Sequence, residues 1–196
     1  FNTLNANTVT SNVVTEAVGS PLTRANTQFG ELQGVGGDYF STPNVVTTWG
    51  ELDIRARAQV DSIPTSFAFL ADKNYSFFLS LNPSGSTQRL RLYVYTILGN
   101  KDSYSPLFSA SQLGVRNWYR ATYDAATGDV KFFTADGNLE APTISDYVQL
   151  GATQNLGAAA IAVTTNSFLA GAWGANPNSY PFDGDIYRSQ VFNEID

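Results

Sequence analysis

Apolar and polar residues alternate along several stretches of the chain, and a period of two is typical of β-strands with one buried face. The pattern is clearest over residues 49–60 and 88–97, where aliphatic side chains occupy one set of alternate positions and charged or aromatic side chains the other. We expect strands at 49–60, 65–71, 75–81, 88–97, 116–123, 129–135, 147–150, 158–163, 168–173 and 185–192.

Turn-forming residues separate these stretches at the spacing of a β-sandwich. Residues 72–74 would close a hairpin between two aromatic strands, and residues 124–128 would join the strands 116–123 and 129–135. The helix-like stretch 155–160 is short and contains Gly157, so we expect no more than a turn there. The pattern predicts an all-β fold of about 12–14 strands in two antiparallel sheets, a jelly-roll sandwich.

Length and composition narrow the class of protein. The 196 residues fit one all-β domain. We assign residues 21–196 to that domain and residues 1–20 to an N-terminal arm or linker, with a first strand of the domain as an equal alternative. Cys, His and Met are absent, which excludes disulfides and histidine-based catalytic triads. The missing Met indicates a processed chain or a part of a longer protein.

The charge and the apolar runs of the chain indicate whether it binds nucleic acid or inserts into a membrane. The formal net charge is −6 and the 11 Lys and Arg residues form no basic tract, so we expect no nucleic-acid partner. No apolar run approaches the roughly 18 residues that a membrane-spanning helix needs, so we expect no membrane insertion. No signal-peptide pattern opens the chain.

The C-terminal stretch has a recognisable order of elements. An apolar segment containing Gly171 is followed by the turn formers 174–179 and then by a short element with Pro181, Phe182, Gly184 and Ile186. This order resembles the C-terminal signature of laminin-G-like domains with the concanavalin A-like fold. Segments 37–43, 52–55, 117–120 and 130–137 match the same family in order.

Residues 186–196 more narrowly resemble domains of bacteriophage virion proteins, of the tail or capsid-decoration kind. The resemblance implies a location on the virion surface or outside the cell. It also implies a chain that is present in multiple copies, with other virion or surface-assembly subunits as partners.

Two carboxylates raise the question of catalysis. Glu51 and Asp53 lie two residues apart on one strand, as in the first half of the Glu-x-Asp-x-x-Glu motif of some concanavalin A-like glycosidases. A retaining glycosidase needs a second carboxyl group about 5–5.5 Å from the first. Arg55 or Ala56 stands where that group is required. We therefore predict no enzyme, and a charged strand face whose Glu51, Asp53, Arg55 and Arg57 pair with neighbouring strands.

Aromatic and planar polar side chains together are typical of glycan-binding surfaces. One row, Arg89, Arg91, Tyr93 and Tyr95, lies on a single strand, and the alternative is an ordinary sheet face. A second group lies in a loop at the sheet rim, and the alternative is packing at the end of the sandwich; its members are Trp173, Asn176, Asn178 and Tyr180. Binding at rim loops is usual in the resembled family, which favours the second group. Trp49 and Trp118 are expected in the core.

Calcium is a further candidate, because relatives in the resembled family bind it at the rim through Asp and backbone oxygens. Asp183 and Asp185 flank Gly184, and Asp72 and Asn74 lie at a predicted hairpin. The alternative is that Asp-Gly forms a turn without metal. No other cofactor is expected.

The sequence thus favours a non-catalytic β-sandwich module of a phage virion or another extracellular assembly. Its role would be structural or decorative, with weak adhesion to host-surface glycans. The alternative is a dedicated carbohydrate-binding, lectin-like module of a larger protein. An atypical glycosidase ranks last.

Overall fold

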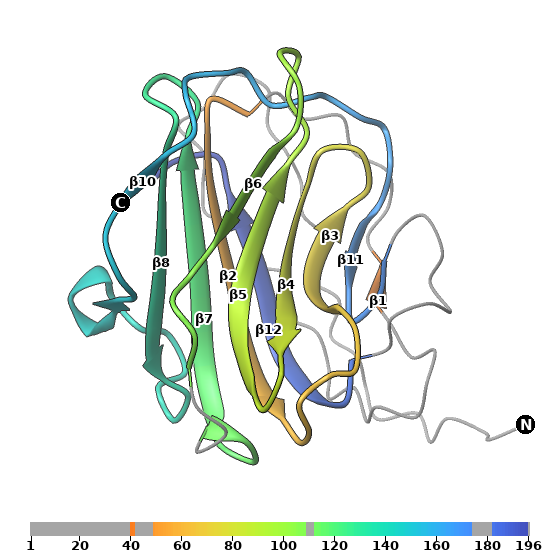
Figure 1. The fold of residues 1–196 in the computed structure, drawn as a ribbon, viewed down its shortest axis with the longest axis vertical. Coiled ribbons are helices and arrows are strands. Elements are labelled where there is room, and N and C mark those ends of the chain that lie inside the picture. The colour runs from red at the N-terminus through yellow and green to blue at the C-terminus, as the bar shows by residue number, and fades with distance from the viewer. Residues whose placement is uncertain (1–39, 42–48, 109–111, 174–181, 196) are drawn as a thin grey trace, which may run out of the picture.

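The computed structural model describes residues 40–41, 49–108, 112–173 and 182–195, and within these residues the chain forms two antiparallel sheets. Sheet A has the order β1-β11-β3-β4-β5-β6 and sheet B the order β10-β8-β7-β2-β12, with β9 paired to β8. Sheet A lies in front of sheet B in Figure 1. The all-β sandwich prediction is confirmed, whereas the arm predicted at 1–20 lies outside the described residues.

The strand bounds show where each element begins and ends. In sheet A they are β1 (Phe40–Ser41), β3 (Ala68–Lys73), β4 (Phe77–Ser84), β5 (Thr87–Val94), β6 (Lys101–Tyr104) and β11 (Phe168–Ala170). In sheet B they are β2 (Glu51–Val60), β7 (Arg116–Asp124), β8 (Asp129–Asp136), β9 (Val148–Gln149), β10 (Gln154–Asn155) and β12 (Gly184–Phe192).

Alternation along β2 and β5 builds the core between the sheets. The inner faces carry Leu52, Ile54, Ala56 and Ala58 from β2 and Leu90, Leu92 and Val94 from β5, and all of these side chains are buried. Tyr119, Tyr123 and Phe132 from sheet B belong to the same cluster as Phe77 and Leu79 from sheet A. Burial of this apolar surface is the main stabilising contribution to such a sandwich.

The two tryptophans predicted for the core occupy different places. Trp49 packs edge-on against Phe77, with ring centroids 5.2 Å apart, at the main core. Trp118 is fully buried, but it lies on the outer face of sheet B in a separate cluster with Ala135 and Tyr147. The register explains this position, because Trp118 pairs with the outward-facing Arg57 rather than with a core residue.

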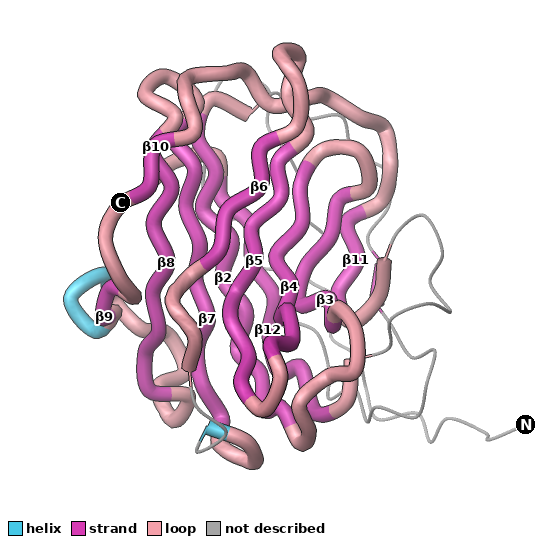
Figure 2. The backbone as a smooth tube through the Cα atoms, viewed as in Figure 1, coloured by secondary structure: helices cyan, strands magenta, loops and turns pink. Residues whose placement is uncertain are grey.

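A loop segment covers part of the outer face of sheet B. It follows β8 and contains a short 3₁₀ helix, η2 (Ile144–Asp146), which Figure 2 shows beside β9 and β8. The indole Nε1 of Trp118 donates to the carbonyl of Leu139 at 2.8 Å. The ring of Tyr147 lies 5.7 Å from the Arg55 guanidinium. Trp118 is therefore buried by this loop.

Some expected bounds were wrong. Asp72 and Lys73 belong to β3, and the hairpin turn lies at 74–76, where Tyr75 has a φ of 61°. No strand forms over 158–163, where an isolated bridge links Ile161 to Thr96. This segment crosses the end of the sandwich, because Ala159 donates to a sheet B turn at Ala125 and Ala162 donates to Tyr95 beside sheet A. A strand needs a run of pairs with one partner.

The remaining differences are small. Residues 155–160 form no helix, and the strand expected at 168–173 ends at Ala170, where Gly171 takes a φ of 86°. The strand expected at 88–97 ends at Val94, and that at 147–150 is reduced to β9. Within the described residues, no helix has the length and apolar character to cross a bilayer.

Candidate functional site

The outer face of sheet A carries the predicted row of Arg and Tyr side chains. Alternation along β5 turns Arg89, Arg91 and Tyr93 away from the core, and each is partly exposed. Tyr95 follows directly after the strand and is held by its backbone, whose N–H donates to Ser76 at 2.8 Å. Since β5 lies between β4 and β6, the last strand in the sheet order, the row lies near one end of sheet A.

Arg91 is fixed on this face by Asp102 of β6. Its Nε and Nη2 donate to the two carboxylate oxygens of Asp102, each at 2.9 Å, and the hydroxyl of Tyr104 donates to the same carboxylate at 3.1 Å. Such a two-point pair sets the plane of the guanidinium. Burial disfavours the charge, but the hydrogen bond and charge of Asp102 outweigh it, so the pKa of Arg91 is raised.

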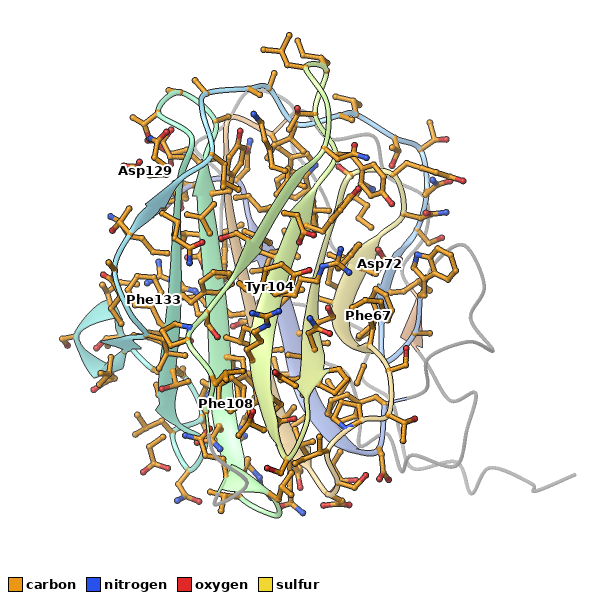
Figure 3. All side chains as sticks on the ribbon, viewed as in Figure 1. Phe67, Asp72, Tyr104, Phe108, Asp129 and Phe133 are labelled. Carbon is orange, nitrogen blue, oxygen red and sulfur yellow. The ribbon has the colours of Figure 1, made fainter. Side chains whose placement is uncertain are left out.

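Aromatic rings surround the same guanidinium. Its carbon lies 4.7 Å from the ring centroid of Phe67, 5.2 Å from that of Phe78 and 5.1 Å from that of Tyr93. Phe78 and Tyr93 are direct partners on β4 and β5, and their rings are parallel at 5.0 Å. In Figure 3 the labelled Tyr104 lies over β5 and Phe67 lies beside β3. Contacts of this kind attract a cation to the ring faces.

The rings continue in both directions and form a row across the sheet, which we call the aromatic row. On one side Tyr93 meets Tyr95 at 5.0 Å, and Tyr95 meets Tyr75 at 5.7 Å. On the other side Phe78 meets Phe69 at 5.1 Å, and Phe69 meets Trp173 at 6.4 Å. The row comprises Tyr75, Tyr95, Tyr93, Phe78, Phe69 and Trp173. The strand row and the rim tryptophan, which the sequence suggested as separate platforms, therefore lie on one surface.

Exposure differs along the aromatic row. Phe69 and Phe78 are buried within it, whereas Tyr93, Tyr95 and Trp173 are partly exposed and Tyr75 is 57% exposed. Burial raises the pKa of Tyr95, so its hydroxyl stays protonated and can donate at neutral pH. The face offers ring edges, hydroxyl groups, a guanidinium and a carboxylate, which together suit a ligand with both C–H and hydroxyl groups.

Several residues of this surface were missed from the sequence: Phe67, Phe69, Tyr75, Phe78, Asp102 and Tyr104. A weak signal existed in β4, where Phe78 and Ser80 alternate with core residues. That period indicates the face but not the neighbours, because the partner of each residue depends on strand register. Asn176, Asn178 and Tyr180 lie outside the described residues.

The carboxylates of the glycosidase-like pattern lie on the other sheet. Asp53 is fully buried on the outer face of sheet B, where it accepts hydrogen bonds from Arg55 and Arg120. The Oε2 of Glu51 accepts from the backbone N–H of Ile195 at 2.7 Å. The predicted pairing with neighbours is confirmed for Asp53, although the pair is buried rather than at the surface.

The candidate calcium ligands divide between the sheets. Asp72 lies in β3 of sheet A, and Asn74 lies in the turn that follows, where its carbonyl accepts from the side chain of Asn166 at 2.9 Å. On the sheet B side, Asp183 accepts from the hydroxyl of Ser62, and Asp185 in β12 accepts from that of Tyr187. The described residues contain no group of three or more Asp or Glu side chains placed to hold a metal ion.

Comparisons with known proteins bear on the fold. No family model matches the chain, and no curated protein matches it. A heptameric pentraxin from Limulus polyphemus aligns with a TM-score of 0.58 at 14% identity, over 85% of this chain and 75% of its own. A CBM40 domain of a Ruminococcus gnavus sialidase, bound to α2,3-sialyllactose, aligns at 0.55 and 14% identity, over 84% of this chain and 91% of its own. The chain has the concanavalin A-like jelly-roll fold.

Domains LG4-5 of the mouse laminin α1 chain also align, with a TM-score of 0.49 and 13% identity, over 86% of this chain and 41% of theirs. At these identities the likeness concerns the fold, and function has to be argued from the chain's own residues.

Proposed function

We propose that this chain is a non-catalytic glycan-binding module, and that its binding surface is the outer face of sheet A around Arg91, Tyr93 and Tyr95. The observation that carries the proposal is the aromatic row, which extends to Trp173 and whose Phe78 and Tyr93 contact the guanidinium of Arg91, itself held by Asp102 in a two-point pair. Sugars bind to such surfaces because C–H groups pack against rings while charged planar groups hold hydroxyls.

The aligned structures support this choice without deciding it. The Ruminococcus gnavus domain holds a sialylated sugar on the same fold. An extended sheet face with partly exposed aromatic residues is also unusual for a surface that meets only water. The proposed role matches the adhesive part of the function favoured by the sequence.

The non-catalytic part of the proposal rests on the carboxylates. Asp53 has no exposed surface and is bound by two guanidinium groups, and Glu51 is engaged by a backbone N–H. A glycosidase needs one carboxylate free to attack and a second that carries a proton beside the substrate. Neither residue is available for such a role.

The setting on a phage virion is the finer part of the proposal, and its support is the resemblance of residues 186–196. A module present in many copies would turn weak single-site binding into firm attachment. The pentraxin that shares the fold is heptameric. An antibody against the chain should then label purified particles at several places each, and labelling of soluble protein alone would contradict the virion setting.

A glycan array followed by calorimetry tests the binding surface. The chain, coupled in many copies to a carrier, should bind a restricted set of glycans. Tyr95→Ala should weaken the best ligand about tenfold or more, which corresponds to one lost stacking contact. Arg91→Lys keeps the charge but loses the two-point geometry, and it should weaken binding as well.

The control is Val148→Ala, which removes a side chain that is 68% exposed on β9 of sheet B. It should leave affinity unchanged. Binding that survives both sheet A variants would contradict this surface, and a flat array at high copy number would contradict a glycan-binding function. Melting temperatures of all variants should stay near that of the parent chain.

A further inference from the structure

Two pairs of arginines stand directly opposite each other on the outer face of sheet B. Arg55 on β2 faces Arg120 on β7, and Arg57 on β2 faces Arg188 on β12. Like charges directly opposite each other destabilise a sheet. Each pair therefore needs an anion, and the two pairs obtain it in different ways.

The first pair, Arg55 and Arg120, is neutralised by the buried carboxylate of Asp53. Asp53 is fully buried, and its oxygens accept from Nε and Nη2 of Arg120 at 2.9 Å each and from Nε of Arg55 at 3.1 Å. The rings of Phe133 and Tyr147 pack against the guanidinium of Arg120 on the outer face of the sheet. Nothing from solvent can replace Asp53 there.

The second pair, Arg57 and Arg188, has Glu140 as its partner, and the carboxylate of Glu140 is exposed. Nη1 of Arg57 donates to Oε1 of Glu140 at 2.8 Å, and Nη1 of Arg188 donates to the backbone carbonyl of the same residue at 2.7 Å. The side chain of Glu140 is 75% exposed, against 7% for that of Arg57. Because its carboxylate side is in contact with water, this ion pair is screened more than the buried pair at Asp53.

A third cation completes the cluster. Arg116 on β7 stacks its guanidinium 3.8 Å from the ring centroid of Tyr187, and Arg57 lies 5.6 Å from the same ring. The Nε of Arg116 is buried and has no hydrogen-bond partner among the described residues. The hydrogen bond and charge of Arg57, with the charges of Arg188 and Arg116, hold the pKa of Glu140 below its usual value.

Glu140 and Asp185 are two carboxylates of the described residues that lie at this cluster. Asp185 lies on the same strand as Arg188, and its carboxylate accepts from the hydroxyl of Tyr187 at 3.1 Å. Among the described residues, three guanidinium groups thus lie near the exposed carboxylate of Glu140 and the carboxylate of Asp185, which already accepts a hydrogen bond. The cluster is therefore locally positive, whereas the chain as a whole has a net charge of −6.

We propose that Arg57, Arg116 and Arg188 form an exchangeable oxyanion site, which takes a carboxylate or sulfate group of an acidic polysaccharide and which Glu140 occupies in the free protein. The site fits one planar or tetrahedral anion, because arginine forks match such groups with paired hydrogen bonds. A nucleic acid is disfavoured, because a long phosphate backbone needs a basic track and this chain is acidic overall.

Calorimetry with trigalacturonate tests the site, with maltotriose as the neutral probe and sodium sulfate as the free anion, all at one ionic strength. Trigalacturonate should bind and maltotriose should not bind at this site. Arg116→Gln should weaken binding about tenfold. Glu140→Gln should tighten it about two- to fivefold, because the internal competitor is removed.

Lys131→Gln is the matched control, since it removes one positive charge from β8 of the same sheet. It should change affinity less than twofold. Competition by sulfate would support the oxyanion chemistry with a small anion as ligand. If Arg116→Gln lowers the melting temperature, Glu140→Gln carries the test, because it alters only an exposed group.

The proposal would be overturned by equal losses in Arg116→Gln and Lys131→Gln, by weaker binding in Glu140→Gln, or by tighter binding of a single-stranded DNA probe that depends on the same arginines. Absence of any trigalacturonate binding would also overturn it. The two proposals can fail separately, because this test depends on Arg116→Gln and Glu140→Gln, whereas the test of the sheet A surface depends on Arg91→Lys and Tyr95→Ala.

Discussion

Asp53 and Arg120 form an ion pair buried within the sheet B side of the molecule, with two hydrogen bonds of 2.9 Å between β2 and β7. Their side chains are 0% and 1% exposed. Since Arg55 donates to the same carboxylate, one acid neutralises the repulsion between two opposed arginines. Loss of the acid would leave uncompensated buried charge, which is far more costly than loss of a surface pair.

Asp53→Asn should therefore lower the free energy of unfolding by about 3–5 kcal/mol. Chemical denaturation at neutral pH measures this change. Asp102→Asn is the matched substitution at the partly exposed pair with Arg91, and it should cost less, about 1–2 kcal/mol. Equal effects in the two variants would show that the buried pair has no special weight.

Gly184, the glycine of the C-terminal signature, begins β12 with a φ of 136° beside Gln59. An added Cβ would lie 2.1 Å from the carbonyl oxygen of Gln59. Gly184→Ala should destabilise the chain by about 2 kcal/mol or more, through strain and through lost pairing of β12 with β2. Gly50→Ala is the control, because its Cβ would meet nothing within 4 Å. A Gly184→Ala chain that unfolds at the parent's denaturant midpoint would refute this reading.

Burial raises the pKa of Tyr119 to about 12. The folded chain thus favours the protonated phenol. Its contribution to the free energy of unfolding is fully present below the unfolded-state pKa of tyrosine, near 10, and is lost as the pH rises through about 12. The expected result is alkaline unfolding that Tyr119→Phe shifts to higher pH, with little change in stability at pH 7. Absorbance titration of both chains locates the ionisation, and a difference spectrum that titrates near pH 10 would contradict the prediction.

Melting curves can test the candidate calcium site at Asp183 and Asp185, for which we expect no binding of note. Each carboxylate already accepts a hydrogen bond from a hydroxyl group. We therefore expect millimolar calcium to raise the melting temperature by less than about 1 °C. Asp183→Asn should then behave like the parent chain with and without chelator. A shift that appears with calcium and disappears in this variant would establish the site.

The sequence predicted orientation more securely than position. In β5 the alternation correctly placed Leu92 inside and Arg91 and Tyr93 outside, because side-chain direction follows from the period of two alone. Over 158–163 the same reasoning failed. The segment is apolar, with four alanines beside Ile161 and Val163, but it crosses the end of the sandwich and has no continuous partner strand.

What the sequence determined by itself was local: which stretches extend, which side chains of each strand face the core, and that Glu51 and Asp53 lack a second catalytic acid nearby. Only the tertiary structure decided which strands are neighbours, because register and sheet order depend on contacts between residues far apart in the chain. Those contacts joined Trp173 to Tyr93 through Phe69 and Phe78. They also set Arg57 opposite Arg188 and brought the exposed carboxylate of Glu140 to Arg57.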